Sequence, residues 1–435
     1  MKPHLELKLR AGTPAPEAPH WEEIIRDKSR AGAEAHPDVA RVLARFGLPV
    51  WVTRAYAPAG EAWSEAEIAS GLDRIYRLVL KEDRAIPPEL VDNIRLLPVV
   101  EYVRPGRVGW TELPLPMPAQ MSATTDLASR RAVGLDEAAE LSRGAPSVMV
   151  AVLDTGVDPA HPELEGTLLP GRDFVDILDG AGAFLGDYLG ADEDPTDEVG
   201  HGTHVAGILA AKGLQMPAGV VPRCRLLPVR VLGAMLQGER RVGAGLIDNI
   251  NAGIKWAVDQ GADVVSMSLG VRHTQGGLPH AEVVEYARRK GVTIVAAAGN
   301  DGTDQLYYPG ALPHVIAVGA VESDGNVAPY STWGAVTIVA PGTNVYSTYV
   351  GHGYAFSTGT SHATPFVSGG VAMLKSYARE RHGVRLGDRQ VKHVLKHTAD
   401  KLGRAFRSRK AGYGRLDLPD ALRLLEDKLT HTTRH

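Results

Sequence analysis

The stretch from Ser357 to Val367, Ser-Thr-Gly-Thr-Ser-His-Ala-Thr-Pro-Phe-Val, constrains the fold of this chain more than any other. Small residues precede Ser361, and the residues after it follow one helical face, with apolar side chains at Val367, Val371 and Leu374. Proline fits a helix best in its first turn, so Pro365 sets the helix start close to Ser361. The sequence therefore predicts a serine at a helix N-terminus, where unpaired amides and the positive end of the helix dipole face outward.

Three other segments carry the polar side chains that a reactive serine needs. The apolar run 148–153 ends at Asp154, and the run 292–298 leads to Asn300, as expected of buried parallel strands whose carboxyl ends gather functional groups. His201 lies among small residues at the start of a predicted helix. A serine hydroxyl is a weak nucleophile unless a base takes its proton and donors receive the oxyanion. Histidine, carboxylate and amide groups meet these needs.

Over roughly residues 122–428 the chain resembles the subtilisin-like serine proteases. Five motifs in the family's order carry the resemblance: Asp154-Thr-Gly, His201-Gly-Thr-His-Val-Ala-Gly, Ser268-Leu-Gly, Ala298-Gly-Asn and Gly359-Thr-Ser. The resemblance implies an α/β fold with a mostly parallel central sheet and helices on both faces, preceded by a small α+β domain. The expected divisions are an N-terminal region over 1–105, a proline-rich connector over 106–121, a catalytic domain over 122–429 and a tail over 430–435.

The resemblance also implies a role for each site residue. Ser361 is expected to attack the carbonyl carbon, His201 to act as base and acid, Asp154 to orient the imidazole, and Asn300 to bind the oxyanion. Two segments are expected to pair with the substrate backbone, namely Gly243, Ala244 and Gly245, and Ser268, Leu269 and Gly270. A third segment, Ala298 and Gly299, is expected to help line the pocket for the residue before the scissile bond. These small residues predict a pocket for a medium or large apolar side chain. Tyr307 leaves two alternatives, because it either points inward and makes the pocket shallow or packs against its own loop.

Two functions are consistent with these motifs. The first is a serine endopeptidase acting through an acyl-enzyme intermediate, with an N-terminal region that inhibits the catalytic domain or assists its folding. The second is an inactive or permanently capped protease scaffold that acts as a binding or regulatory protein. The end of the first region, Leu96–Val103, resembles the close of a subtilisin-type pro-domain, although a small structural or partner-binding module is the alternative. Any self-cleavage is expected in the extended connector.

Composition limits the partners. The net charge of −4 argues against broad binding to nucleic acid, and no run is long and apolar enough to span a membrane. The N-terminus lacks the apolar core of a signal peptide, and the single cysteine, Cys224, excludes an internal disulfide. The expected location is therefore cytoplasmic or unknown. The expected partners are peptide or protein substrates and the chain's own N-terminal domain.

No cofactor is expected, and a structural calcium ion is not supported by the loop sequences. In relatives a carboxylate at the position of Glu163 helps to hold calcium, but the loop 212–219 lacks the family's asparagine-bearing calcium loop. Glu163 is accordingly expected to be a solvated turn residue. Asp197 is expected beside the cleft, where it would favour a basic substrate residue. A capping box at Ser64 predicts a helix whose apolar stripe continues to Val79.

Overall fold

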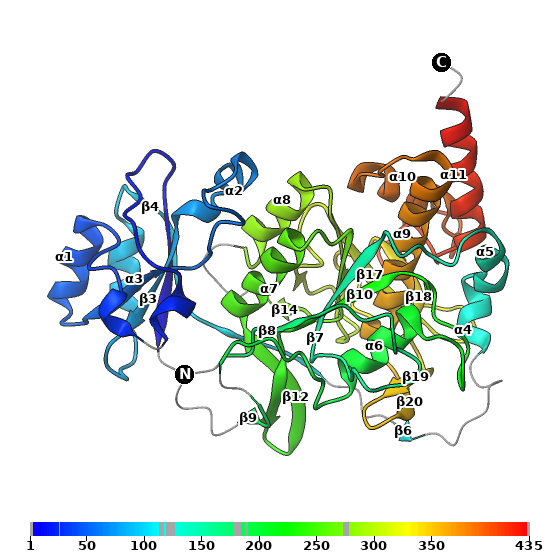
Figure 1. Cartoon of the computed structure of the whole chain (residues 1–435), viewed down its shortest axis with the longest axis horizontal. Helices are drawn as coiled ribbons and strands as arrows, with labels where there is room; N and C mark the ends of the chain where they lie inside the picture. Colours follow the sequence, from blue (N-terminus) through cyan, green and yellow to red (C-terminus); the bar gives the residue numbers. More distant parts are fainter. Residues whose placement is uncertain are drawn as a thin grey trace.

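A parallel sheet of seven strands forms the centre of the larger part of the molecule (Figure 1). The computed structural model describes residues 3–25, 27–112, 117–118, 127–176, 184–187, 190–272 and 278–432. Across the sheet the strands are β18 (Ile338–Pro341), β17 (Val315–Val321), β15 (Thr293–Ala297), β13 (Val264–Met267), β7 (Met149–Asp154), β10 (Arg225–Arg230) and β8 (Arg172–Asp173). Every pairing between neighbours is parallel. This confirms the predicted α/β fold.

Helices cover both faces of this sheet because alternate residues of each strand point to opposite sides. In β7, Val150 and Val152 pack into the core with α6 (His201–Ala210) and α9 (Thr360–His382). Ala151 and Leu153 pack into the core with α7 (Ile247–Asp259) and α8 (Ala281–Arg289). Both faces of β7 are therefore apolar, and the strand ends at Asp154.

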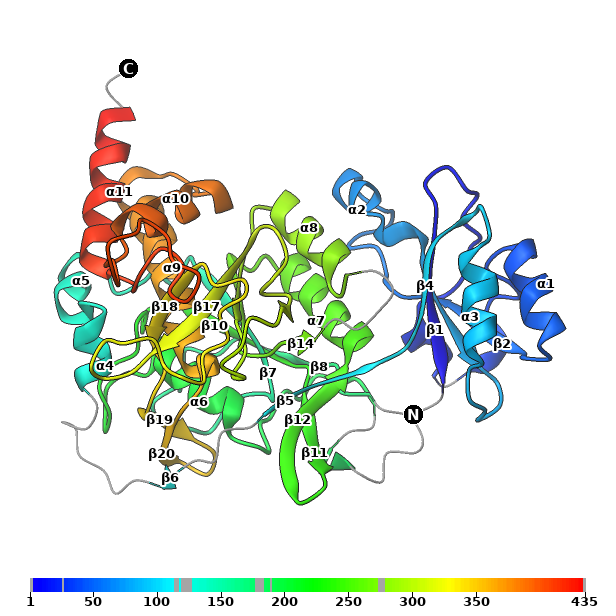
Figure 2. The same cartoon turned by 180° about the vertical axis from the view of Figure 1, so that it is seen from behind.

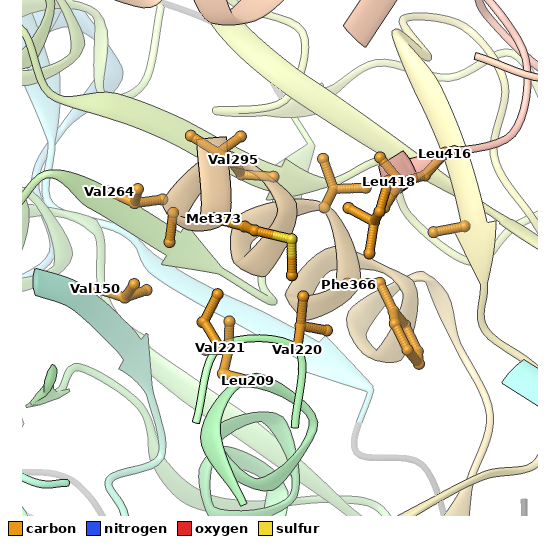
Figure 3. Close-up of a cluster of buried hydrophobic side chains, with 14 of the residues drawn as sticks. Val150, Leu209, Val220, Val221, Val264, Val295, Phe366, Met373, Leu416 and Leu418 are labelled. Carbon is orange, nitrogen blue, oxygen red and sulfur yellow. The ribbon is translucent and has the colours of Figure 1, made fainter. Parts of the chain in front are cut away.

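The long helix α9 runs through the first of these cores. Figure 3 shows its Phe366 and Met373 among Val150, Val264 and Val295 of the sheet. Gly369 permits close approach, since a Cβ atom there would lie 2.6 Å from Cβ of Val220. Shorter helices close this side of the molecule: α4 (Leu127–Ala132), α5 (Leu135–Leu141), α10 (Asp388–Thr398) and α11 (Leu418–Thr432). Among the described residues, none of the helices is both long and apolar enough to cross a membrane.

The N-terminal part is a separate antiparallel sheet, as predicted for a small α+β domain. Its order is β2 (Val50–Arg54), β3 (Ile75–Leu80), β1 (His4–Leu9) and β4 (Val100–Pro105), and α1 (Pro37–Arg45) and α3 (Pro88–Arg95) pack on it. In β1 the leucines at 5, 7 and 9 face these helices. His4, Glu6 and Lys8 alternate with them, and this polar face lies beside α7 and α8 (Figure 1).

One strand of this region was not predicted, and one predicted helix ends earlier than expected. The strand β1 was not predicted, because its alternating His-Leu-Glu-Leu-Lys-Leu pattern looks like a solvated edge although all six residues are buried. The helix expected to reach Val79 is α2 (Glu65–Ser70), which keeps the capping box at Ser64 but ends at Gly71. Gly71 has a left-handed φ of 76°, and the β-branched and aromatic residues after Arg74 form β3 instead.

Three smaller sheets border the carboxyl edge of the parallel sheet. One has the order β5 (Val108–Glu112), β12 (Arg240–Leu246), β11 (Gly233–Gln237) and β9 (Phe184–Leu185). The others pair β14 (Val271–Arg272) with β16 (Tyr307–Tyr308), and β19 (Val345–Tyr349) with β20 (Gly353–Ser357) and β6 (Met117–Pro118). Residues 113–116 and 119–121 of the expected connector, and 433–435 of the expected tail, lie outside the described residues.

Glu163 is not the solvated turn residue that we expected, since it is fully buried. Its carboxylate accepts hydrogen bonds from four successive backbone amides, those of residues 213 to 216, at 2.6 to 3.3 Å. These amides belong to the loop that follows α6. The carboxylate thus fixes the loop by accepting from the backbone directly.

Replacing Glu163 with Gln should lower the free energy of unfolding by about 1–3 kcal/mol, because the neutral amide cannot accept from the four N–H groups as the carboxylate does. Equilibrium urea unfolding would measure the change. Glu165→Gln is the matched control, since Glu165 is exposed and pairs only with Lys212 within reach of solvent. Equal stability of the two variants would contradict this role, and a loss seen only without EDTA would indicate a bound calcium ion instead.

Candidate active site

The first pair of expected site residues lies at the end of β7 and the start of α6. Nδ1 of His201 lies 2.6 Å from Oδ1 of Asp154, and both residues are almost completely buried. The same carboxylate oxygen accepts from the backbone N–H of Thr155 at 2.8 Å. Burial alone would lower the pKa of His201, but the charge and the hydrogen bond of Asp154, together with the charge of Asp197, outweigh burial and raise the pKa above the ordinary value. The imidazole is therefore held as a base with its other nitrogen, Nε2, available.

Ser361 is the second residue of α9, which begins at Thr360 as the sequence predicted. Its hydroxyl donates to the backbone carbonyl of Ser268 at 3.1 Å, and the hydroxyl of Ser268 donates to the carbonyl of Ser361 at 2.7 Å. Nε2 of His201 has no hydrogen-bond partner among the described residues. The serine hydroxyl and the imidazole are thus not hydrogen-bonded to each other in this rotamer.

Asn300, after β15, is tied to the same helix start. Its Oδ1 atom accepts from the backbone N–H and the hydroxyl of Thr360, each at 2.8 Å. Because the oxygen is engaged by α9, the NH₂ group of the amide remains as the donor. The first turn of α9 also presents backbone N–H groups that have no carbonyl one turn earlier in the helix. Asn300 and the nucleophile region therefore form a cluster of donors suited to an anion.

Two further histidines pack beside this pair. Nε2 of His204 lies 3.1 Å from the carbonyl oxygens of both Val345 and Ala355, so it ties α6 to β19 and β20. Burial lowers its pKa to about 3, which keeps it neutral, as expected of a structural histidine. His362 lies fully buried between the rings, with centroids 4.5 Å from His204 and 5.4 Å from His201.

The expectation for Asp197 was wrong, because its carboxylate is buried and does not face the cleft. It accepts from the backbone N–H groups of Val199, Gly200 and Thr203, and from the hydroxyls of Thr155 and Thr203. These bonds join the Asp154 strand to the first turn of the His201 helix. Asp197 therefore positions the histidine. Its place four residues before His201, just ahead of a predicted helix, is where a carboxylate often accepts from the first amides of a helix, and this spacing could have indicated its role.

The residues expected to pair with a substrate backbone lie where β12 and the segment after β13 flank a cleft. Gly243, Ala244 and Gly245 pair with Thr111, Trp110 and Gly109 of β5, so the chain's own strand lies on this edge (Figure 2). On the other side, a Cβ atom on Gly109 would lie 2.4 Å from Cγ1 of Val271. The connector segment thus runs between both edges in extended form.

A cavity of about 310 Å³ adjoins Ser361 and Asn300. Leu269, Gly270 and Gly299 line it, as expected, together with Ala297. Ser268 instead contacts Ser361 directly. Ala298, which was expected in the lining, packs in a hydrophobic cluster with Val321, Val336, Val339 and Ala411, because side chains alternate along the strand exit.

The structure distinguishes the two alternatives for Tyr307, since its ring points inward and lines the same cavity. A Cβ atom on Gly299 would lie 2.6 Å from Cδ2 of this ring, and one on Gly270 would lie 3.3 Å from Cδ1. Asp301, the residue after Asn300, pairs with Arg272 and with the Tyr307 hydroxyl. Its charge is therefore already compensated.

No group of three or more His, Cys, Asp and Glu side chains is arranged to hold a metal ion among the residues that the structure describes. The carboxylate of Glu163, the position that the family resemblance links to calcium, is occupied by backbone amides. Amide N–H groups repel a cation. The residues around Glu163 therefore do not fit a calcium ion.

Comparisons with known proteins agree with this geometry. The subtilase family model matches residues 145–414. The chain is 38% identical over 293 residues to the thermophilic serine proteinase of Bacillus sp. (strain AK1), spanning 66% of this chain and 64% of that protein. It is 40% identical over 252 residues to the major intracellular serine protease of Bacillus subtilis (strain 168), spanning 56% and 73%. The solved structure of the prenylagaramide maturation protease PagA is similar with a TM-score of 0.55 and 29% identity, over 67% of this chain and 98% of that chain. The chain belongs to the subtilase family.

Proposed function

We propose that this protein is a serine endopeptidase in which Ser361, His201 and Asp154 form a catalytic triad. Ser361 attacks the substrate carbonyl, His201 takes the hydroxyl proton at Nε2 and later delivers it to the leaving amine, and Asp154 stabilises the imidazolium. The buried 2.6 Å contact between His201 and Asp154 is the observation that carries this proposal. The two Bacillus relatives named above are serine proteases, which supports the same reaction.

The proposed attack requires one local rearrangement. The Ser361 hydroxyl has to turn about its Cα–Cβ bond from the Ser268 carbonyl toward Nε2 of His201. Rotation between staggered positions of a serine side chain is a small change, and catalytic hydrogen bonds are often long or absent before substrate binds. The oxyanion would be received by the side-chain amide of Asn300 and the backbone N–H of Ser361.

A fluorophosphonate probe tests the function directly. The wild-type chain should be labelled and Ser361→Ala should not, because the phosphonyl group reacts only with an activated serine hydroxyl. Ser29→Ala is the control, since Ser29 is an exposed serine of the N-terminal part outside the site, and this variant should keep the label. Absence of label on the wild-type chain, even after limited proteolysis, would contradict the proposal and favour an inactive scaffold.

The pH dependence of kcat/KM should report the pKa of His201, which the contact with Asp154 raises. The base must be neutral, so a pKa of His201 raised above 6.5 moves the fall in rate on acidification to higher pH. In Asp154→Asn the largest influence that raises the pKa of His201 is lost, and burial then outweighs the smaller effect of the Asp197 charge. The acid limb should therefore shift to lower pH while the rate drops by roughly 10⁴. Asp194→Asn, in the exposed loop before His201, serves as control and should change neither. An unshifted limb in Asp154→Asn would contradict the assigned pair.

We propose that the N-terminal region inhibits the catalytic domain by holding β5 in the substrate cleft. The register of β5 on β12 is that of an extended peptide bound through main-chain hydrogen bonds. Beyond it, Met117 and Pro118 pair with β20, which leads into α9. The described ends of the connector therefore lie on either side of Ser361, and any self-cleavage is expected between them.

Buried polar contacts between the N-terminal sheet and the catalytic helices support this inhibitory role. Nε2 of His4 lies 2.6 Å from Oδ2 of Asp248, and Lys8 pairs with Glu282 at 3.0 Å. Glu67 pairs with Lys255 at 2.8 Å. Hydrogen-bonded charged groups fix the orientation of two units more than they raise affinity, so the region is held in register yet remains separable.

The change Gly109→Val should raise the peptidase rate of the intact chain by about 5- to 150-fold, because the added side chain would overlap Val271 and weaken the binding of β5. Gly60→Val is the control, since no atom lies within 4 Å of a Cβ atom there. Initial rates on a short peptide would be measured for protein that mass spectrometry identifies as one chain. An unchanged rate in Gly109→Val, or an equal rise in both variants, would contradict inhibition by β5.

A further inference from the structure

Tyr307 lies in a narrow slot beside the proposed nucleophile. One wall of the slot is the segment that follows β13 and contains Gly270, and the other follows β15 and contains Gly299. The ring contacts both glycines, as the short distances from their notional Cβ atoms indicate. Because Ser361 and Asn300 border the same cavity, a bound carbonyl group would bring the side chain of its own residue to this slot.

Three contacts hold the ring in place. The Tyr307 hydroxyl donates to Oδ2 of Asp301 at 2.6 Å, and Nε of Arg272 donates to the same hydroxyl at 2.8 Å. Arg272 also pairs with Asp301, which closes the triangle. Burial and the bond to Asp301 raise the pKa of Tyr307 to about 12, so the hydroxyl keeps its proton and remains a donor.

The backbone reinforces this arrangement. Arg272 of β14 lies directly opposite Tyr307 of β16, and Val271 lies opposite Tyr308. Cross-strand partners have side chains close enough to interact, so the ladder itself brings the guanidinium to the tyrosine. A ring fixed through its backbone, its hydroxyl and two glycine contacts is a wall of the slot and not a freely rotating side chain.

We propose, on the basis of the function proposed above, that Tyr307 occupies the slot between Gly270 and Gly299, which is the inner part of the pocket for the residue before the scissile bond. The open cavity beside Ser361 is the part of the pocket that the ring leaves free. The protease would then select peptides with a small residue, such as glycine, alanine or serine, at that position. Larger side chains would have to displace a ring that is held by Asp301 and Arg272. This revises the sequence-based expectation of a pocket for a medium or large apolar side chain.

The test compares two peptides that differ only in alanine or phenylalanine before the scissile bond. The ratio of their kcat/KM values does not depend on how much enzyme β5 inhibits, so the full chain can be used. We expect the wild type to favour alanine by roughly 10- to 100-fold, because overpacking a filled site costs binding energy. Tyr307→Ala should raise the rate on the phenylalanine peptide at least tenfold and reverse the preference. Leu306→Ala, at the exposed neighbouring position, should leave the ratio unchanged.

A second variant guards against a folding defect in Tyr307→Ala. Asp301→Asn keeps the ring but weakens its anchor, and it should give a ratio between those of the wild type and Tyr307→Ala. Equal rates on both peptides by the wild type, or no gain on phenylalanine in either variant, would overturn the role of Tyr307. If the wild type takes fluorophosphonate label, such a result contradicts the pocket assignment alone. If it takes no label and cleaves neither peptide, the proposed function fails and this inference fails with it.

Discussion

The packing of α9 against the parallel sheet is the constraint on which the rest of the site depends. Residues 360 to 378 of this helix are buried, including the polar Ser361, His362 and Lys375. A buried helix can be displaced only at the cost of its whole apolar surface, so its N-terminus is fixed against the ends of β7, β13 and β15. Gly369 and Gly370 make this possible, because side chains there would meet Val220 and Leu418. The nucleophile is therefore positioned by the core and not by its own loop.

Much of this arrangement was predictable because short sequence patterns specify the elements that carry the site. Apolar runs ending at Asp154 and Asn300 specify strands, and the small residues before Ser361 indicate a helix start. The expectation that Pro365 lies in the first turn was wrong, because α9 begins at Thr360 and Pro365 lies inside it. The hydroxyl of Ser268 donates to the Ser361 carbonyl, one turn before the proline that lacks an N–H. The residues whose roles the sequence did not reveal act through partners far along the chain. Glu163 is buried because four amides of residues 213 to 216 surround it, and Asp197 because it joins β7 to α6. A carboxylate with such partners cannot be distinguished from a solvated one by its neighbours in sequence.

The burial of the polar residues in β1 was likewise not predictable from the sequence, for a different reason. In β1 the apolar face packs on α1 and α3, whereas His4, Glu6 and Lys8 are buried against α7 and α8. Burial raises the pKa of Glu6 to about 8 even though Arg104 lies beside it. Such a face reads as solvent-exposed in the sequence, because buried charge is rare unless it is paired. Glu6 pairs with Arg104 of the same sheet, whereas His4 and Lys8 have partners on α7 and α8. The polar face of β1 is therefore matched in part by the helices of the second unit.

The two occupants of the cleft act on different features of a substrate. The strand β5 pairs with the main chain of β12, whereas Tyr307 occupies space that a side chain would need. Main-chain pairing binds any extended peptide, and side-chain pockets choose among them. A cleft whose pocket is already filled still accepts the backbone of its own connector. In the proposed protease, inhibition by the N-terminal region therefore does not require a residue that fits the pocket. Main-chain pairing with β12 decides whether the cleft is occupied, and the pocket beside Tyr307 decides which bond is cleaved.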